Sequence, residues 1–238
     1  MYQPIMKDAQ LPLNAAEQLA AQGFVVLPGP NVPGGIARLQ SAYDACVESA
    51  DPADVRIASS LRVTDFVNRS PEFDCIYIHP PLLAACYSVI DRPFKLSSTC
   101  ARTLSPGAPA QALHVDVKRG SRDWPMVGYI WMIDAFDADN GATRFIPGSH
   151  LSPYAPDKSQ ISGTNDVTLA CGPAGSLIIF DASVWHGHGA NHSSRPRRSV
   201  QGHFVARDAW SAIDYRSRMK AETFSRLGDV AKYLLELE

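Results

Sequence analysis

The chain has 238 residues, and its 22 Lys and Arg residues nearly balance 24 Asp and Glu residues, for a formal net charge of −2. This length fits one large domain or two small ones, and the charge balance argues against a nucleic-acid-binding protein or one that adheres to an acidic membrane surface. The longest nearly uninterrupted apolar run, residues 82–90, is too short to span a bilayer, and the first residues lack the pattern of an export signal. We therefore expect a cytoplasmic protein with no nucleic-acid or membrane partner.

Helical patterns dominate the first 93 residues. We expect a helix over residues 15–21, ended by Gly23, and a short strand over residues 24–27. A second helix follows Gly35, where apolar residues recur at a spacing of three or four, and a third covers residues 82–90 between flanking prolines. We expect these helices to buttress one sheet of the core.

From residue 94 onward the chain consists of short β-rich runs separated by Gly, Pro, Asn and Asp. The runs cover residues 94–104, 113–117, 126–136, 142–146, 167–171, 176–180, 183–186 and 199–206. Short strands at this spacing, without intervening helices, favour a sandwich or barrel, and a jelly roll fits best.

Helical spacing returns after the last of these runs, at residues 209–219 and 230–237. No linker separates the three parts of the sequence. We therefore predict a single domain over residues 1–238. Its parts are a mostly helical N-terminal buttress (1–93), a jelly-roll core (94–206) and C-terminal helices (207–238).

The sharpest local signal for chemistry is the pair His114 and Asp116. If residues 113–117 form a strand, both side chains project from the same face, about 7 Å apart, and can hold one metal ion. Because the chain has seven histidines, such a pair also arises by chance. A histidine at a strand edge beside a solvated aspartate is the alternative interpretation.

The segment 185–198 offers the missing partners, namely histidines for a third metal ligand and an arginine eleven residues beyond one of them. Two imidazoles and one carboxylate on one face of an octahedral ion leave three positions open, which is the arrangement of non-heme Fe(II) oxygenases. Two open positions suit a bidentate 2-oxo acid, and the third suits dioxygen. A five-carbon 2-oxo diacid also needs a cation for its far carboxylate, with which a guanidinium pairs bidentately.

Six sequence blocks resemble one known family. They lie at residues 23–29 (GFVVLPG), 111–116 (QALHVD), 131–134 (WMID), 139–150 (DNGATRFIPGSH), 173–181 (PAGSLIIFD) and 186–197 (HGHGANHSSRPR). In this order they resemble the phytanoyl-CoA dioxygenase family of Fe(II)- and 2-oxoglutarate-dependent oxygenases. The resemblance implies a mainly β fold with flanking helices, around a double-stranded β-helix (jelly-roll, cupin-like) core.

The resemblance also implies roles for individual residues. His114, Asp116 and His186 would bind iron, and Arg197 would bind the far carboxylate of 2-oxoglutarate. Fe(II) would be the cofactor, 2-oxoglutarate and O2 the co-substrates, and a small molecule the substrate. Many relatives have a serine at the position of His188 that touches the cofactor, so His188 either contacts 2-oxoglutarate or the substrate, or packs away from them.

Four further residues are candidates for lining the cofactor pocket: Arg102, Gln111, Tyr129 and Trp131. A solvated arginine, a turn glutamine and a core aromatic residue are the corresponding alternatives. Arg195 and Arg198 compete for the carboxylate-binding role, but the eleven-residue offset favours the arginine between them.

The reaction that the resemblance implies is oxidation of an aliphatic C–H bond of a small metabolite in secondary or specialised metabolism. Hydroxylation is the expected outcome, with succinate and CO2 as co-products, and desaturation, cyclisation or epimerisation are alternatives. Asp116 disfavours a halogenase, because related halogenases have Gly or Ala there. A non-oxidative metal-dependent isomerase or hydrolase of the same fold would not need Arg197.

Two surface segments are candidates for substrate contact. Lys118, Arg119 and Arg122 follow the metal motif and would clamp a carboxylate or phosphate, unless they form a solvated loop. Residues 151–166, rich in Ser, Pro and Gly, are the candidate lid. The sequence is compatible with either a monomer or a homodimer.

Overall fold

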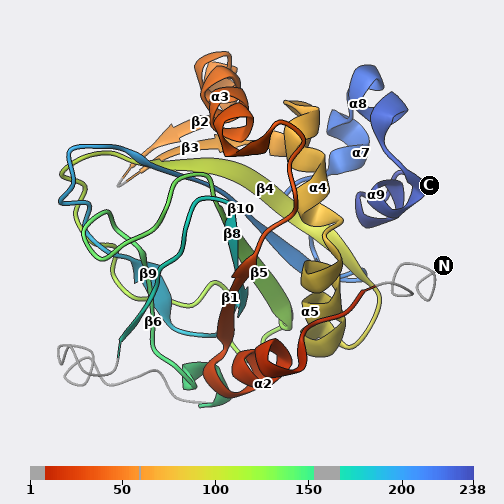
Figure 1. Cartoon of the computed structure of the whole chain (residues 1–238). Coiled ribbons are helices and arrows are strands. Elements are labelled where there is room, and N and C mark those ends of the chain that lie inside the picture. The colour runs from red at the N-terminus through yellow and green to blue at the C-terminus, as the bar shows by residue number, and fades with distance from the viewer. Residues whose placement is uncertain (1–8, 59, 153–166) are drawn as a thin grey trace.

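The computed structural model describes residues 9–58, 60–152 and 167–238. Its strands form two antiparallel sheets, with the order β1-β8-β5-β10-β4-β3-β2 in the large sheet and β7-β6-β9 in the small one (Figure 1). The strands are β1 (Phe24–Pro28), β2 (Val55–Ile57), β3 (Leu61–Thr64), β4 (Phe94–Leu104), β5 (Met126–Met132), β6 (Thr143–Phe145), β7 (Thr168–Ala170), β8 (Ser176–Asp181), β9 (His186–His188) and β10 (Arg197–Ala206). The predicted fold class, a mainly β jelly-roll core with flanking helices, is confirmed.

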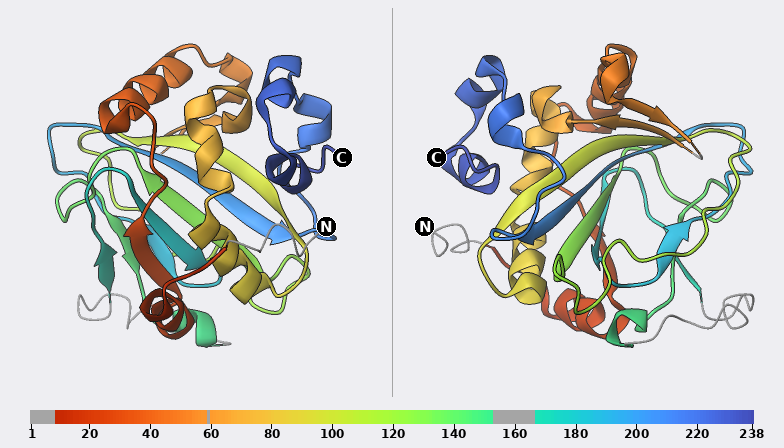
Figure 2. Two further views of the ribbon diagram at one scale, coloured as in Figure 1. Left: turned by 45° about the vertical axis from the view of Figure 1, so that its right-hand side comes forward. Right: turned by 180° about the vertical axis from the view of Figure 1, so that it is seen from behind.

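The helices cover one face of the large sheet, and the small sheet lies on its other side (Figure 2). The helices are α2 (Leu13–Gln22), α3 (Gly35–Glu48), α4 (Asp74–Tyr77), α5 (Pro80–Ile90), α7 (Tyr215–Arg218), α8 (Ala221–Arg226) and α9 (Asp229–Leu234), and the 3-10 turns are η1 (Pro52–Asp54), η2 (Phe66–Asn68), η3 (Pro71–Phe73) and η4 (Ser149–Leu151). Helix α2 ends at Gly23, as predicted, because Gly23 adopts a left-handed conformation and its N–H donates to the carbonyl of Leu19.

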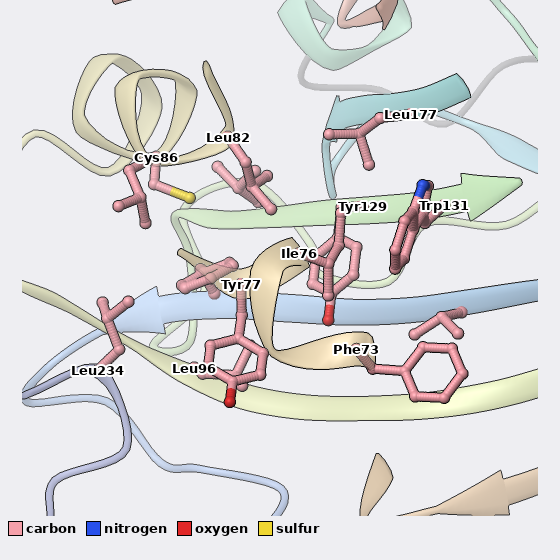
Figure 3. Close-up of a cluster of buried hydrophobic side chains, with 14 of the residues drawn as sticks. Phe73, Ile76, Tyr77, Leu82, Cys86, Leu96, Tyr129, Trp131, Leu177 and Leu234 are labelled. Atoms are coloured by element: carbon pink, nitrogen blue, oxygen red, sulfur yellow. The ribbon is translucent and has the colours of Figure 1, made fainter. Parts of the chain in front are cut away.

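A separate hydrophobic core packs against each face of the large sheet. Because side chains alternate along a strand, Tyr129 and Trp131 of β5 face the helices, whereas Ile130 and Met132 face the small sheet. Figure 3 shows the helix-side core, in which residues of η3, α4 and α5 pack onto the sheet. The lining residues Thr143, His186 and His188 place the largest part of the cavity around the predicted metal ligands, the metal cavity, on the side of the small sheet.

The prediction of a strand over residues 113–117 is wrong. His114 makes a single antiparallel bridge with His186, and the backbone N–H groups of Asp116 and Val117 then both donate to the carbonyl of Ala182. The chain bends here because it follows the irregular segment before β9 instead of a regular neighbouring strand.

Other boundaries also differ from prediction. The strand expected at residues 183–186 is β9, which begins at His186, and the helix expected at residues 209–219 shortens to α7. Helix α7 begins late because the carboxylate of Asp214 caps it by accepting from the N–H groups of Arg216 and Ser217. The sequence also gave no sign of β2 and β3, whose three and four residues are too few for a periodic pattern.

One stretch, Pro71–Ile90, is long and apolar enough to cross a membrane by length and composition, with a mean hydropathy of 1.3. Half of it is buried, and it is divided among η3, α4 and α5. Its residues Phe73, Ile76, Leu82 and Cys86 lie in the helix-side core (Figure 3). Packing against the sheet therefore accounts for the apolar character of this stretch.

Candidate metal centre and cofactor pocket

Three predicted ligands meet at one point between the two sheets. The backbones of His114 and His186 exchange two hydrogen bonds of 2.9 Å, N–H to carbonyl in both directions. The Nε2 atom of each histidine lies 3.4 Å from a carboxylate oxygen of Asp116. One ligand atom from each of the three residues lies within 4.8 Å of the others, a spacing that allows all three to bind the same ion.

Hydrogen bonds turn the ligand atom of each imidazole toward this point. Nδ1 of His114 donates to the carbonyl of Ala112 at 3.1 Å, and Nδ1 of His186 donates to the carbonyl of Val184 at 3.0 Å. With the proton on Nδ1, each Nε2 keeps its lone pair for a metal. The ring of Phe180, 4.7 Å away between centroids, further fixes the ring of His186. The donor set and its orientation therefore fit a ferrous ion.

The carboxylate of Asp116 faces inward although its backbone is open to solvent, and 22% of its side chain is exposed. Burial of the carboxyl favours its neutral form. The neighbouring imidazoles of His114, His186 and His203 outweigh that effect and hold the pKa of Asp116 well below its usual range. Asp116 is therefore an anion at neutral pH, as a metal ligand must be.

His203 on β10 was not among the candidate residues. Its Nε2 donates to Oδ2 of Asp116 at 2.9 Å, so it orients the carboxylate. The sequence could have predicted this role, because side chains alternate between the two faces of a strand. Counting in twos from Arg197 along β10 places Ser199, Gln201 and His203 on the same face. Gln201 and His203 both line the metal cavity.

Arg197 is buried, with 1% of its surface exposed. Its guanidinium stacks 4.1 Å from the centre of the Phe136 ring, and its three nitrogens have no hydrogen-bond partner in the described part of the chain. Burial, followed by the nearby charge of Arg102, lowers the pKa of Arg197 to about 9, which still leaves it protonated at neutral pH. A buried cation without a partner is costly, so this position fits an anionic ligand.

The competing arginines lie elsewhere. Arg198 points to the helix side, where its guanidinium binds Asp134 of the loop after β5 at 2.7 Å and Asp44 of α3 at 2.6 Å. Arg195 is exposed in the turn before β10. Among the three, only Arg197 lines the metal cavity.

Arg102, Gln111 and His188 also line this cavity, which has a volume of about 170 Å³. Arg102 donates to the hydroxyl of Ser60 at 3.0 Å and to Oε1 of Gln111 at 3.2 Å. Burial, opposed by a hydrogen bond to Gly189 and aided by three neighbouring arginines, lowers the pKa of His188 to about 4, so His188 is neutral. Its buried Nε2 has no partner in the described ranges.

The structure contradicts the prediction that Trp131 lines the cofactor pocket. Trp131 points to the helix side, donates from Nε1 to the carbonyl of Gly175 and packs edge-on against Phe73 (Figure 3). Its neighbour Ile130 lines the cavity, because adjacent residues of β5 face opposite sides of the sheet. Tyr129, which packs in the helix-side core, also borders the cavity.

The basic segment after the metal motif does not line the metal cavity. Lys118, Arg119 and Arg122 are exposed, and Arg119 donates to the carbonyl of His150 at 2.6 Å. Of the candidate lid, residues 153–166 lie outside the described residues.

The chain is similar to known dioxygenases. The model of the phytanoyl-CoA dioxygenase family matches residues 19–199. The dioxygenase trt7 of Aspergillus terreus is 29% identical over 211 residues, which cover 79% of this chain and 71% of the relative. Some other curated relatives match over less than half of their own length.

Two solved structures share the fold. HygX from Streptomyces hygroscopicus, with nickel and 2-oxoglutarate bound, has a TM-score of 0.70 at 16% identity and covers 85% of this chain and 90% of its own. The carbocyclase SnoK from nogalamycin biosynthesis has a TM-score of 0.68 at 16% identity, covering 89% and 92%. The protein is a non-heme iron dioxygenase of the class that depends on 2-oxoglutarate, with O2 as the second co-substrate. Within that class, the chain belongs to the phytanoyl-CoA dioxygenase family.

Proposed function

We propose that this enzyme oxidises an aliphatic C–H bond of a small metabolite of secondary metabolism, in the cytoplasm, by hydroxylation. The observation that carries the proposal is the unpartnered guanidinium of Arg197, buried in the same cavity as the three candidate ligands. A non-oxidative isomerase or hydrolase would leave that buried cation without a role.

His114, Asp116 and His186 would hold the ferrous ion through Nε2, a carboxylate oxygen and Nε2. When bound, the iron would couple the oxidative decarboxylation of 2-oxoglutarate by O2, to succinate and CO2, to oxidation of the substrate. Arg197 would bind the far carboxylate of 2-oxoglutarate through two hydrogen bonds. His203 would keep the Asp116 carboxylate in its orientation, and Arg102 and Gln111 would line the space around the co-substrate.

Burial strengthens the electrostatic interactions of the groups in this cavity. His186, His188 and Arg197 are all buried, so water is largely kept from the cavity and each charge acts in a low dielectric. His188, which is neutral, adds no charge beside the far carboxylate. It is a contact residue for 2-oxoglutarate or the substrate through its unpartnered Nε2.

Cyclisation is the second candidate reaction, because a structure with this fold is a carbocyclase. Hydroxylation and cyclisation require the same placement of iron and 2-oxoglutarate and differ in how the substrate is held. Product analysis by mass spectrometry separates them, since hydroxylation adds one oxygen atom and ring closure removes two hydrogen atoms.

The proposal is tested without a substrate. We expect anaerobic addition of Fe(II) and 2-oxoglutarate to the purified protein to produce a weak charge-transfer band in the visible region. Asp116→Ala should abolish the band with the fold retained, as judged by circular dichroism. A folded wild-type protein that shows no band at saturating Fe(II) and 2-oxoglutarate would refute the proposed function.

A further inference from the structure

A second cavity of about 430 Å³ adjoins the metal cavity. Strands β2, β3 and β4 form its floor, and Ala212 and Ile213, which follow β10, form part of its wall. The two cavities share Arg62, Ser98 and Cys100 as lining residues. The metal cavity is small for a binding pocket, whereas the second has a volume typical of ligand sites, so the second is the natural location for most of the substrate.

A row of arginines crosses this floor. In the antiparallel register Arg56 of β2 lies directly opposite Arg62 of β3, and Arg62 lies directly opposite Arg102 of β4. Residues directly opposite each other share a face of the sheet. The three side chains therefore form one row, with Arg102 in the metal cavity, Arg62 lining both cavities and Arg56 in the outer one.

This row is unfavourable for stability by itself. Like charges directly opposite on neighbouring strands destabilise a sheet. Burial, followed by the charge of Arg62, lowers the pKa of Arg102 to about 10. Arg102 is buried, whereas Arg56 and Arg62 are exposed to solvent, so the electrostatic cost of the row falls mainly on Arg102.

The row has almost no anionic partners. Arg102 donates to two neutral oxygens, of Ser60 and Gln111, and Arg62 makes no hydrogen bond or ion pair with any residue that the structure describes. No Asp or Glu is among the described residues that line the second cavity. In the metal cavity Asp116 is the single described carboxylate, and three imidazoles already surround it.

With Fe(II) and 2-oxoglutarate bound, the two cavities would still hold more positive than negative charge. The two negative charges of 2-oxoglutarate offset the two positive charges of Fe(II), and Asp116 offsets Arg197. Arg102 and Arg62 then remain without an anion. An anionic group on the substrate would offset this excess, in part if it is a carboxylate and fully if it is a doubly charged phosphate.

We infer that the substrate carries an anionic group, a carboxylate or a phosphate, and that Arg62 binds this group at the junction of the two cavities. This inference rests on the proposed function, because that function supplies the iron and 2-oxoglutarate in the inner cavity. Arg56 lies at the outer end of the row, where its guanidinium donates to the carbonyls of Ala53 and Val55. The guanidinium of Arg62 offers paired N–H donors and a positive charge without an anionic partner among the described residues, which suits an oxyanion.

The test uses small probes on the protein loaded with Mn(II) and saturated with 2-oxoglutarate. Butyrate, butyl phosphate and neutral butyramide are titrated, and the paramagnetic broadening of their proton NMR signals gives the dissociation constants. We expect at least one of the two anions to bind, more weakly as salt rises, and butyramide to bind at least tenfold more weakly. The preferred anion identifies the carboxylate or the phosphate as the substrate group.

The variants locate the binding. Arg62→Gln should weaken binding of the preferred anion about tenfold or more, and Arg62→Lys, which keeps the charge and loses the fork, should fall between. The control Arg92→Gln, at an exposed arginine near Asp208, should match wild type. Because Arg62→Gln removes a like charge from the row, the variant should unfold at the same temperature as wild type or a higher one. If Arg62 had a structural role, the unfolding temperature of the variant would fall.

Two results would overturn the inference: equal binding of butyramide and the anions, or anion binding that Arg62→Gln leaves unchanged. Both are separable from failure of the proposed function. If the Fe(II) and 2-oxoglutarate band forms and the anion test fails, only the substrate class is wrong. If the band does not form, calorimetric titration of the same probes into the metal-free protein still tests Arg62.

Discussion

Two adjacent arginines show how single residues of this protein take opposite roles. Arg197 and Arg198 begin β10, and because they are neighbours on a strand they face opposite sides of the sheet. Arg198 finds two carboxylates on the helix side, whereas Arg197 finds none in the described structure. One residue is therefore available to a ligand, and the other holds the sheet to α3.

Substitution of these two arginines should give opposite effects. Arg197→Gln should raise the 2-oxoglutarate concentration for half-maximal band formation by at least about tenfold, because hydrogen bonds to charged groups contribute about 1.5–3 kcal/mol. Arg198→Gln should leave that concentration unchanged and lower the free energy of unfolding by about 1–2 kcal/mol. Anaerobic titration and urea unfolding measure the two quantities. The reverse pattern would show that Arg198 is the carboxylate-binding residue.

At the scale of elements, the metal site depends on how β5 and β8 pair. Gly128 of β5 lies directly opposite Phe180 of β8, and the ring of Phe180 lies over Gly128, where a side chain would stand. The same ring packs against His186. A glycine in one strand therefore helps to position a ligand in another.

Gly128→Ala tests this link between strands. The added methyl group would overlap the Phe180 ring, so we expect a loss of about 1–3 kcal/mol in stability and weaker Mn(II) binding as His186 shifts. Gly228→Ala is the matched control, because nothing lies within 4 Å of its added Cβ and its φ of −79° suits any residue. Mn(II) affinity by electron paramagnetic resonance and urea unfolding provide the readouts. If Gly128→Ala is destabilised but binds Mn(II) as tightly as wild type, the packing of Phe180 on Gly128 does not position His186.

At the scale of the whole molecule, the site joins distant parts of the chain. His114 and Asp116 lie in a loop between β4 and β5, His186 begins β9, and Arg197 begins β10. The large sheet takes β1, β2 and β3 from the first 93 residues and the rest from the core. On this ground we propose that the chain is a single domain, and the metal site exists only when that domain is folded.

Ligands that bind only the folded state should therefore stabilise it. With Mn(II) and 2-oxoglutarate at about one hundred times their dissociation constants, each should add about 2.7 kcal/mol and raise the melting temperature by several degrees. In Asp116→Ala the metal should give no such rise, since two imidazoles are a poor site on their own. Differential scanning calorimetry measures both proteins with and without the ligands. An equal rise in the variant would place metal binding elsewhere.

Local motifs selected the jelly-roll class and the pair His114 and Asp116. The resemblance of six sequence blocks to the phytanoyl-CoA dioxygenase family selected His186 and Arg197, and the fold brings all four residues together. These signals are short-range, because the spacing of ligands and the turn residues each involve residues that are close together in the sequence. The side of β5 on which Trp131 lies, the bend that replaces a strand at residues 113–117, and the approach of His203 to Asp116 were decided by pairing between strands far apart in sequence. Register sets which face of each strand meets the cavity, and no short window of residues encodes it.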